Sequence, residues 1–325
     1  MALEMGRNFL RLCTATLSAA GAVTLTACTA PQPPASVVPP NRPGGLAKAV
    51  QPVVTPRSAQ SSDLQDYYIR IQDDLLVQGL LRTDGGGPDT PFSPEDLVRN
   101  FENIAFFDEY TRGGGLRAGG ASGGLNRWSQ PVRISAEFGS SVPLDQRRRD
   151  QAAINEYASR LSRVTGHSIT GVRSGGNFHV FVAGDDDNEQ LLRRLNQLVP
   201  DISRVELGLF RHLPRSFYCM VVAVSSAQDP HNYSRAIALI RAEHPDLVRL
   251  SCIHEEIAQG LGLPNDSAAA RPSIFNDDNE FALLTRHDEL LLKLLYDPRL
   301  KQGMTADEAR PIALAIAHEL MGMEL

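Results

Sequence analysis

The segment at residues 251–267 constrains the fold of this chain more than any other part of its sequence. Apolar residues lead into it and through it at helical spacing, at Leu250, Ile253, Ile257 and Leu261. A glycine and a proline follow within the next three residues, and together they predict the end of the helix. We therefore expect one buried helix over 247–261, here called the signature helix, closed by a tight glycine turn.

Three oxygen-bearing side chains are placed around that turn. Glu255 and Gln259 are four residues apart, so both leave the same face of the helix. The glycine turn can fold the chain back and bring Asn265 towards them, beside Glu256. Such a convergence is the geometry on which metal-assisted hydrolases are normally built, and it makes this segment the candidate functional site.

This segment resembles the zinc-binding segment HExxHxxGxxH of the metzincin peptidases, and of matrixins in particular. In that family two histidines one helical turn apart and a third after the glycine bind zinc, and the glutamate activates water. Aligned without gaps, Glu255, Gln259 and Asn265 occupy the three histidine positions, Glu256 that of the catalytic glutamate and Gly262 that of the turn glycine. The resemblance implies a peptidase scaffold that lacks every zinc-binding histidine.

Other stretches resemble the same family in the same order along the chain. Downstream, Ser273 to Phe275 is similar to the Met-turn segment, with Phe275 in place of the methionine, and 284–296 is similar to the closing helix of a matrixin. Upstream, 128–134 and the helix after it are similar to the start of the catalytic domain. The resemblance implies an α+β fold, a metzincin-like domain with a mixed twisted sheet and the signature helix beneath it.

The whole chain also resembles an uncharacterised family of Gram-negative bacterial lipoproteins that carries a domain of unknown function. The pattern CIHEExxQxLGLxND, which runs here from Cys252 to Asp266, is similar to that family's own signature. The altered ligand set would then be a property of the family. His254 lies one residue before the first ligand position, about 100° round the helix, and so does not replace the missing histidine.

Residues 1–28 have the pattern of an export signal. Arg7 and Arg11 precede an apolar run from Leu12 to Leu25, and the segment closes with Leu-Thr-Ala-Cys at Cys28. This end resembles the lipobox of bacterial lipoproteins, whose cysteine receives a diacylglyceryl group and becomes the first residue of the mature chain. The resemblance implies a membrane anchor on Cys28, and an ordinary cleaved signal peptide is the alternative.

Three segments separate the signal from the main domain. A proline-rich stretch lacks the large apolar residues needed to fold and is interpreted as a disordered tether, two amphipathic patterns predict a helical pair, and a glycine-rich stretch predicts a linker. The predicted boundaries are 29–60 for the tether, 61–112 for the helical pair, 113–126 for the linker and 127–325 for the metzincin-like domain. In the domain, strands are predicted at 132–138, 168–172, 178–182 and 217–224, and helices at 144–164, 189–198, 232–242, 285–296 and 305–321.

Two cysteines remain in the exported chain besides the lipid-bearing one. Cys219 falls in a predicted core strand and Cys252 in the signature helix. In an exported protein such a pair predicts a disulfide, which would stabilise the fold by about 3 to 4 kcal/mol, and two buried thiols are the alternative. The formal net charge of −6 gives no support for a nucleic-acid partner.

The side chains at the three ligand positions do not suit zinc. Zinc prefers nitrogen and sulfur ligands, whereas Glu255, Gln259 and Asn265 offer one charged and two neutral oxygens. We therefore expect no cofactor and no zinc. A site for calcium or magnesium, which take oxygen ligands, stays open if Asp266 or Asp277 joins the group.

Without a metal, the segment has two further uses. Glu255 and Glu256 could act as an acid and base pair, although neighbouring helix positions point about 100° apart. Alternatively, Gln259, Asn265 and Asp266 join Glu255 in a hydrogen-bond network that holds the glycine turn where the peptidases bind zinc.

These patterns predict a periplasmic protein, held by a lipid on Cys28 at the inner leaflet of the outer membrane. Its peptidase-like domain is expected to have a non-catalytic binding or scaffold role, with a peptide or an envelope protein as the partner. The alternative is a peptidase-like hydrolase in which Glu256 acts as the general base, with a metal other than zinc or with none.

Overall fold

The computed structural model describes residues 56–107, 123–200, 207–208, 211, 214–276 and 278–322. These residues belong to one compact unit, Gln51–Leu325. The predicted export signal, Cys28, nearly all of the predicted tether and Asp277 lie outside the described residues. Within the described ranges, no helix combines the length and the apolar character that crossing a bilayer requires.

A five-stranded mixed sheet forms the centre of this unit, with strand order β2-β1-β3-β5-β4. β1 (Val132–Phe138) lies between β2 (Ile169–Val172) and β3 (Phe178–Ala183), and these three strands are parallel. β3 also pairs in parallel with β5 (Asp229–Arg241), which pairs antiparallel with β4 (Cys219–Ser226). The predicted mixed sheet is therefore present, and β4 is an edge strand among the described strands.

The strand β5 corrects a prediction, because the sequence indicated a helix over 232–242. Side chains along β5 alternate between the two faces of the sheet: Ala236 and Ile240 join the larger core, whereas Ile237 and Leu239 join the smaller one. A strand buried on both faces loses the alternation of apolar and polar residues and becomes a continuous apolar run. Periodicity alone does not distinguish such a run from a buried helix.

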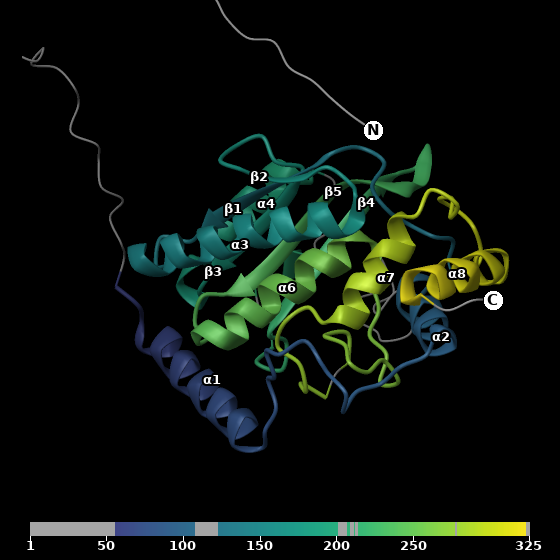
Figure 1. Cartoon of the computed structure of the whole chain (residues 1–325). Coiled ribbons are helices and arrows are strands. Elements are labelled where there is room, and N and C mark those ends of the chain that lie inside the picture. The colour runs from purple at the N-terminus through teal and green to yellow at the C-terminus, as the bar shows by residue number, and fades with distance from the viewer. Residues whose placement is uncertain are drawn as a thin grey trace, which may run out of the picture. The chain divides into compact units, whose positions relative to one another are not determined.

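Helices cover both faces of the sheet unequally. One face carries the larger core, to which five of the described helices contribute, and α4 (Asn188–Leu198) packs with the smaller core on the opposite face. The five helices are α2 (Pro94–Ala105), α3 (Leu144–Thr165), α6 (Asp246–Gly262), α7 (Arg286–Tyr296) and α8 (Ala306–Met321). Figure 1 shows α3 and α6 side by side across this face. The predicted signature helix is α6, and it lies directly beneath the sheet.

Local hydrogen bonds fix where several helices begin. Ser93 forms a capping box with Asp96 at the start of α2, and Thr305 does the same with Glu308 at the start of α8. Each box satisfies backbone N–H groups that have no partner inside the helix. These starts are therefore set by residues within four positions of each other, which explains why sequence finds them.

The first helix, α1 (Ala59–Val77), is tied to the end of the sheet. The Arg57 guanidinium donates to the carbonyl of Ala242 at 3.0 Å, and the Ser61 hydroxyl donates to the Glu243 carboxylate at 2.8 Å. Both acceptors directly follow β5. Arg57, which the sequence places at the end of the tether, thus takes part in the folded unit, and α1 begins at Ala59, before the predicted start of the helical pair.

Candidate functional site

Close packing fixes α6 against the sheet. A side chain at Gly260 would place its Cβ 2.5 Å from the ring of Phe178 and 3.1 Å from Val221, so only glycine permits this approach. The Trp128 indole N–H donates to the Gly260 carbonyl at 2.8 Å. The site residues on α6 therefore stand on a helix that cannot move away from the strands without breaking these contacts.

A disulfide joins Cys219 on β4 to Cys252 on α6, which confirms the predicted pairing. Cys252 is 2% exposed, whereas Cys219 is half-buried. The link connects the edge strand of the sheet to the helix that carries the candidate site. The covalent bond therefore holds this helix to the sheet.

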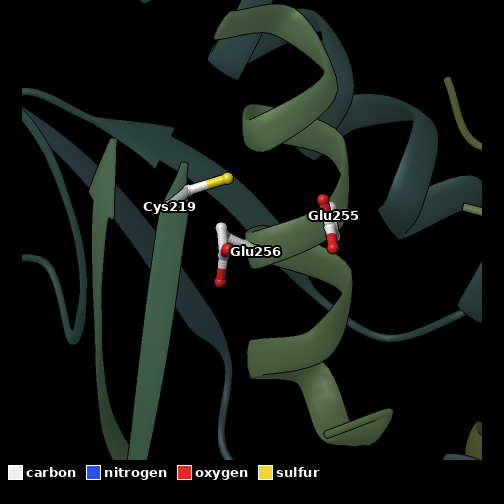
Figure 2. Close-up of side chains that lie close together, drawn as sticks. All are labelled: Cys219, Glu255 and Glu256. Atoms are coloured by element: carbon white, nitrogen blue, oxygen red, sulfur yellow. The ribbon is translucent and has the colours of Figure 1, made fainter. Parts of the chain in front are cut away.

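The two neighbouring glutamates lie close to this disulfide. Glu256 is 3% exposed and Glu255 is half-buried. One carboxylate oxygen of each lies within 4.8 Å of the other and of the Cys219 sulfur. Figure 2 shows Glu256 pointing from α6 towards the strand that carries Cys219. Although neighbouring positions point apart on a helix, the glutamate side chains are long enough to bring their oxygens to this separation.

The other two ligand-position residues make contacts of their own. The Gln259 amide donates to the Asp266 carboxylate at 3.2 Å, across the turn at Gly262. The Asn265 amide instead donates to the backbone carbonyl of Asn103 in α2 at 2.8 Å. The structure thus brings Gln259 together with Asp266 and directs Asn265 to α2.

His254 lies on a different part of α6 and is a core residue. Its ring stacks on Tyr157 of α3 with a centroid distance of 4.0 Å, and its Nδ1 accepts the Leu284 N–H at 3.1 Å. Burial, and secondarily the nearby Arg160 guanidinium, lowers the pKa of His254 from 6.5 to about 3. The imidazole is therefore neutral near pH 7 and links α3, α6 and the segment before α7.

Metal ligation by this site depends on the oxidation state of the cysteines. Among the described residues, Cys219, Glu255 and Glu256 form a group whose ligand atoms are close enough to hold one metal ion. The Cys219 sulfur is bonded to Cys252, so in this state only the two carboxylates could bind a cation. Binding of calcium or magnesium stays a prediction, and Asp277 lies outside the described residues.

A buried carboxylate on α7, whose structural role the sequence did not indicate, orders the segment Ser273 to Phe275. Asp288 accepts the Ser273 hydroxyl at 2.6 Å, the Ile274 N–H at 3.1 Å and the Thr285 N–H at 2.9 Å. Phe275 is fully buried in the larger core. The available signal was the capping box of α7, in which Thr285 and Asp288 are three residues apart.

Two cavities lie away from the predicted site, near the ends of the parallel strands. One, of about 570 Å³, is lined by residues that include Gly184, Asp185 and Arg241, and another, of about 480 Å³, by residues that include His244 and Arg249. None of the residues at the three ligand positions lines either cavity. The sequence signal that could have indicated these cavities was the presence of polar residues directly after an apolar strand.

The fold and the site define a mixed α and β domain in which a disulfide joins an edge strand to a helix bearing two carboxylates. Residues 94–315 match a family described as protein of unknown function, DUF2927. The match spans more than half of the chain, and the protein belongs to this family. No curated protein and no solved structure shows a significant match.

Proposed function

We propose that this protein is a lipid-anchored envelope protein whose metzincin-like domain binds a peptide without hydrolysing it. The peptide adds as a further strand along β4, and Glu255 and Glu256 attract a cationic side chain of that peptide. The observation that carries the proposal is an edge strand cross-linked to a helix that bears two carboxylates close to the link.

The contacts of the ligand-position residues support a role without zinc hydrolysis. Gln259 is engaged with Asp266, and Asn265 with the backbone of α2. A zinc peptidase needs its ligands to converge on the metal that activates water. The Gln259 and Asn265 amides instead stabilise the glycine turn and its contact with α2, which is a structural role.

The position of β4 supports strand addition. Among the described strands β4 pairs on one side only, with β5, and its Val222 is 37% exposed. An edge strand offers backbone N–H and C=O groups to an extended peptide, and side-chain contacts then supply specificity. The disulfide holds β4 in place before binding, so little conformational entropy is lost when the peptide adds.

The lipid anchor is supported by the sequence that ends at Cys28, which resembles a lipobox. The proline-rich tether would let the domain reach a partner in the periplasm while the lipid stays in the membrane. An envelope protein with an unstructured basic segment fits this proposal. Loss of radiolabelled palmitate in a Cys28→Ser variant tests the anchor separately from the binding function.

Peptide binding is tested with a phage-displayed library of random linear peptides, selected on the oxidised protein. We expect enriched peptides to carry lysine or arginine, and Val222→Lys to weaken their binding by on the order of tenfold, because charge on an edge strand opposes addition of another strand. The matched control is Ile69→Lys on α1, where the native side chain is 38% exposed. No enrichment, or equal weakening by both variants, would refute strand addition at β4.

The hydrolase alternative is tested on the same oxidised preparation. A quenched fluorogenic peptide library should show no turnover, and metal analysis should find no tightly held ion. Turnover that disappears in Glu256→Gln while the fold is retained would instead establish Glu256 as a general base and overturn the binding proposal.

A further inference from the structure

Three potential metal ligands, Cys219, Glu255 and Glu256, gather where α6 meets β4, and Cys252 is bonded to the first of them. Cys252, Glu255 and Glu256 are at positions i, i+3 and i+4 of α6, so their side chains share one side of the helix. The disulfide brings Cys219 from β4 to the same place. The Cys219 sulfur and one oxygen from each glutamate lie within 4.8 Å of one another, which one metal ion can span.

The donor atoms of this group suit a cation. One oxygen of each carboxylate and the Cys219 sulfur lie within reach of a single ion, at a place where Glu256 is only 3% exposed. The disulfide is neutral. If it is reduced, two thiols that can ionise stand beside the carboxylates, and the ligand set gains the sulfur that zinc prefers.

We propose that the Cys219–Cys252 disulfide controls a zinc site: the oxidised protein holds no zinc, and the reduced protein binds one zinc ion through Cys219, Cys252, Glu255 and Glu256. Four protein ligands make a closed site with no position for a reactive water, so the bound zinc is structural and not hydrolytic. The zinc site lies beside β4, where we also propose that a peptide binds, but zinc binding does not depend on peptide binding.

The redox step requires a dithiol protein as the reductant. Its thiolate attacks the sulfur of Cys219, the less buried residue of the pair, forms a mixed disulfide and expels Cys252 as a thiolate. Its second thiol then attacks the mixed disulfide, releases Cys219 and leaves the reductant oxidised. Two electrons thus pass to the cysteine pair, and the two protons of the dithiol end on the two cysteine sulfurs. When zinc binds, the cysteines release these protons to water.

This exchange keeps the edge strand attached to the helix in both states. The disulfide ties β4 to α6 when oxidised, and zinc ligated from both elements ties them when reduced. If the disulfide is reduced in the absence of zinc, neither a covalent bond nor a metal ion joins β4 to α6 at the two thiols and the two carboxylates. The zinc ion therefore replaces the covalent bond as the constraint on β4.

The experiment is a zinc titration of the full chain against a chromogenic competitor, before and after reduction with a phosphine. We expect no zinc on the oxidised protein and one ion per chain on the reduced protein. Cobalt in place of zinc should give the absorption of a tetrahedral site with thiolate ligands, and an unfolded reduced protein should refold when zinc is added.

Variants separate this site from adventitious binding to free thiols. Glu255→Gln and Glu256→Gln should each weaken zinc binding more than about a hundredfold, since even partners outside the ligand shell contribute up to that factor. Glu289→Gln on α7 is the control and should bind zinc as the native protein does. Reduced protein that holds no zinc, or zinc affinity that both ligand variants leave unchanged, would overturn the proposal whether or not a peptide binds.

Discussion

Acid should destabilise the fold through His254, whose neutral ring is buried between α3 and α6. The pKa is lowered from 6.5 to about 3 in the folded protein. The unfolded chain therefore binds a proton that the folded chain does not. The resulting stability is complete above pH 6.5 and is lost as the pH falls from there towards 3.

The magnitude follows from the pKa difference. Each pH unit below the unfolded pKa removes about 1.4 kcal/mol from the free energy of unfolding, so acidification from about pH 7 to about pH 5 should remove about 2 kcal/mol through His254 alone. His244, whose pKa burial also lowers to about 3, should contribute a similar loss. Raised carboxyl pKa values at Asp150 and Glu243, caused by burial, act in the opposite direction.

The variant His254→Asn isolates this residue. An asparagine oxygen can still accept the Leu284 N–H but does not titrate, and loss of the ring stack on Tyr157 should cost about 2 to 3 kcal/mol at neutral pH. The difference in unfolding free energy between the native and the variant protein should then be smaller by about 2 kcal/mol at about pH 5 than at neutral pH. His244 and the carboxyl groups are present in both proteins and cancel in the comparison.

The assay is urea unfolding across this pH range, followed by the fluorescence of Trp128, the only tryptophan in the chain and fully buried. Unfolding free energies of the two proteins that remain parallel from pH 7 to pH 5 would refute the account, because they would show that His254 titrates equally in the folded and unfolded states.

Three further perturbations test the packing around the site by equilibrium unfolding. Replacing both cysteines by serine, in Cys219→Ser with Cys252→Ser, should cost about 3 to 4 kcal/mol in chelator, and a cost near zero would contradict the constraint assigned to the disulfide. Arg249→Met should cost about 3 to 5 kcal/mol because it leaves the buried Asp150 carboxylate, 2.9 Å from the guanidinium, without its counter-charge; a neutral effect would count against that pair. Gly262→Ala should cost about 3 kcal/mol, since φ is +130° and the new Cβ would lie 2.4 Å from a backbone oxygen, and unchanged stability would show that the turn can relax.

Local patterns account for the parts of the fold that sequence predicted well. The ends of α6 and the alternation in β1 depend on residues a few positions apart. The pairing of Cys219 with Cys252 was predictable for another reason: once the predicted export signal and Cys28 are set aside, two cysteines remain and allow a single intramolecular pairing.

The candidate site was predictable only in part. Sequence placed Glu255, Glu256 and Gln259 on one helix, but the contacts of their side chains depend on β4, on the chain after the turn and on α2. The same limit applies to β5, part of which was predicted as a helix because packing on both faces of the sheet makes its sequence a continuous apolar run. The positions of the segments that pack there are set by the fold of the whole domain and leave no short-range pattern.

By itself the sequence determined the signature helix and its glycine turn, and it predicted the pairing of Cys219 with Cys252. Only the tertiary structure decided that Glu256 is buried beside Cys219 and that His254 is a neutral core residue. Helix periodicity and capping are short-range properties of the chain. Burial, and the shifts in pKa and ligand geometry that come with it, depends on which distant segments pack against a side chain.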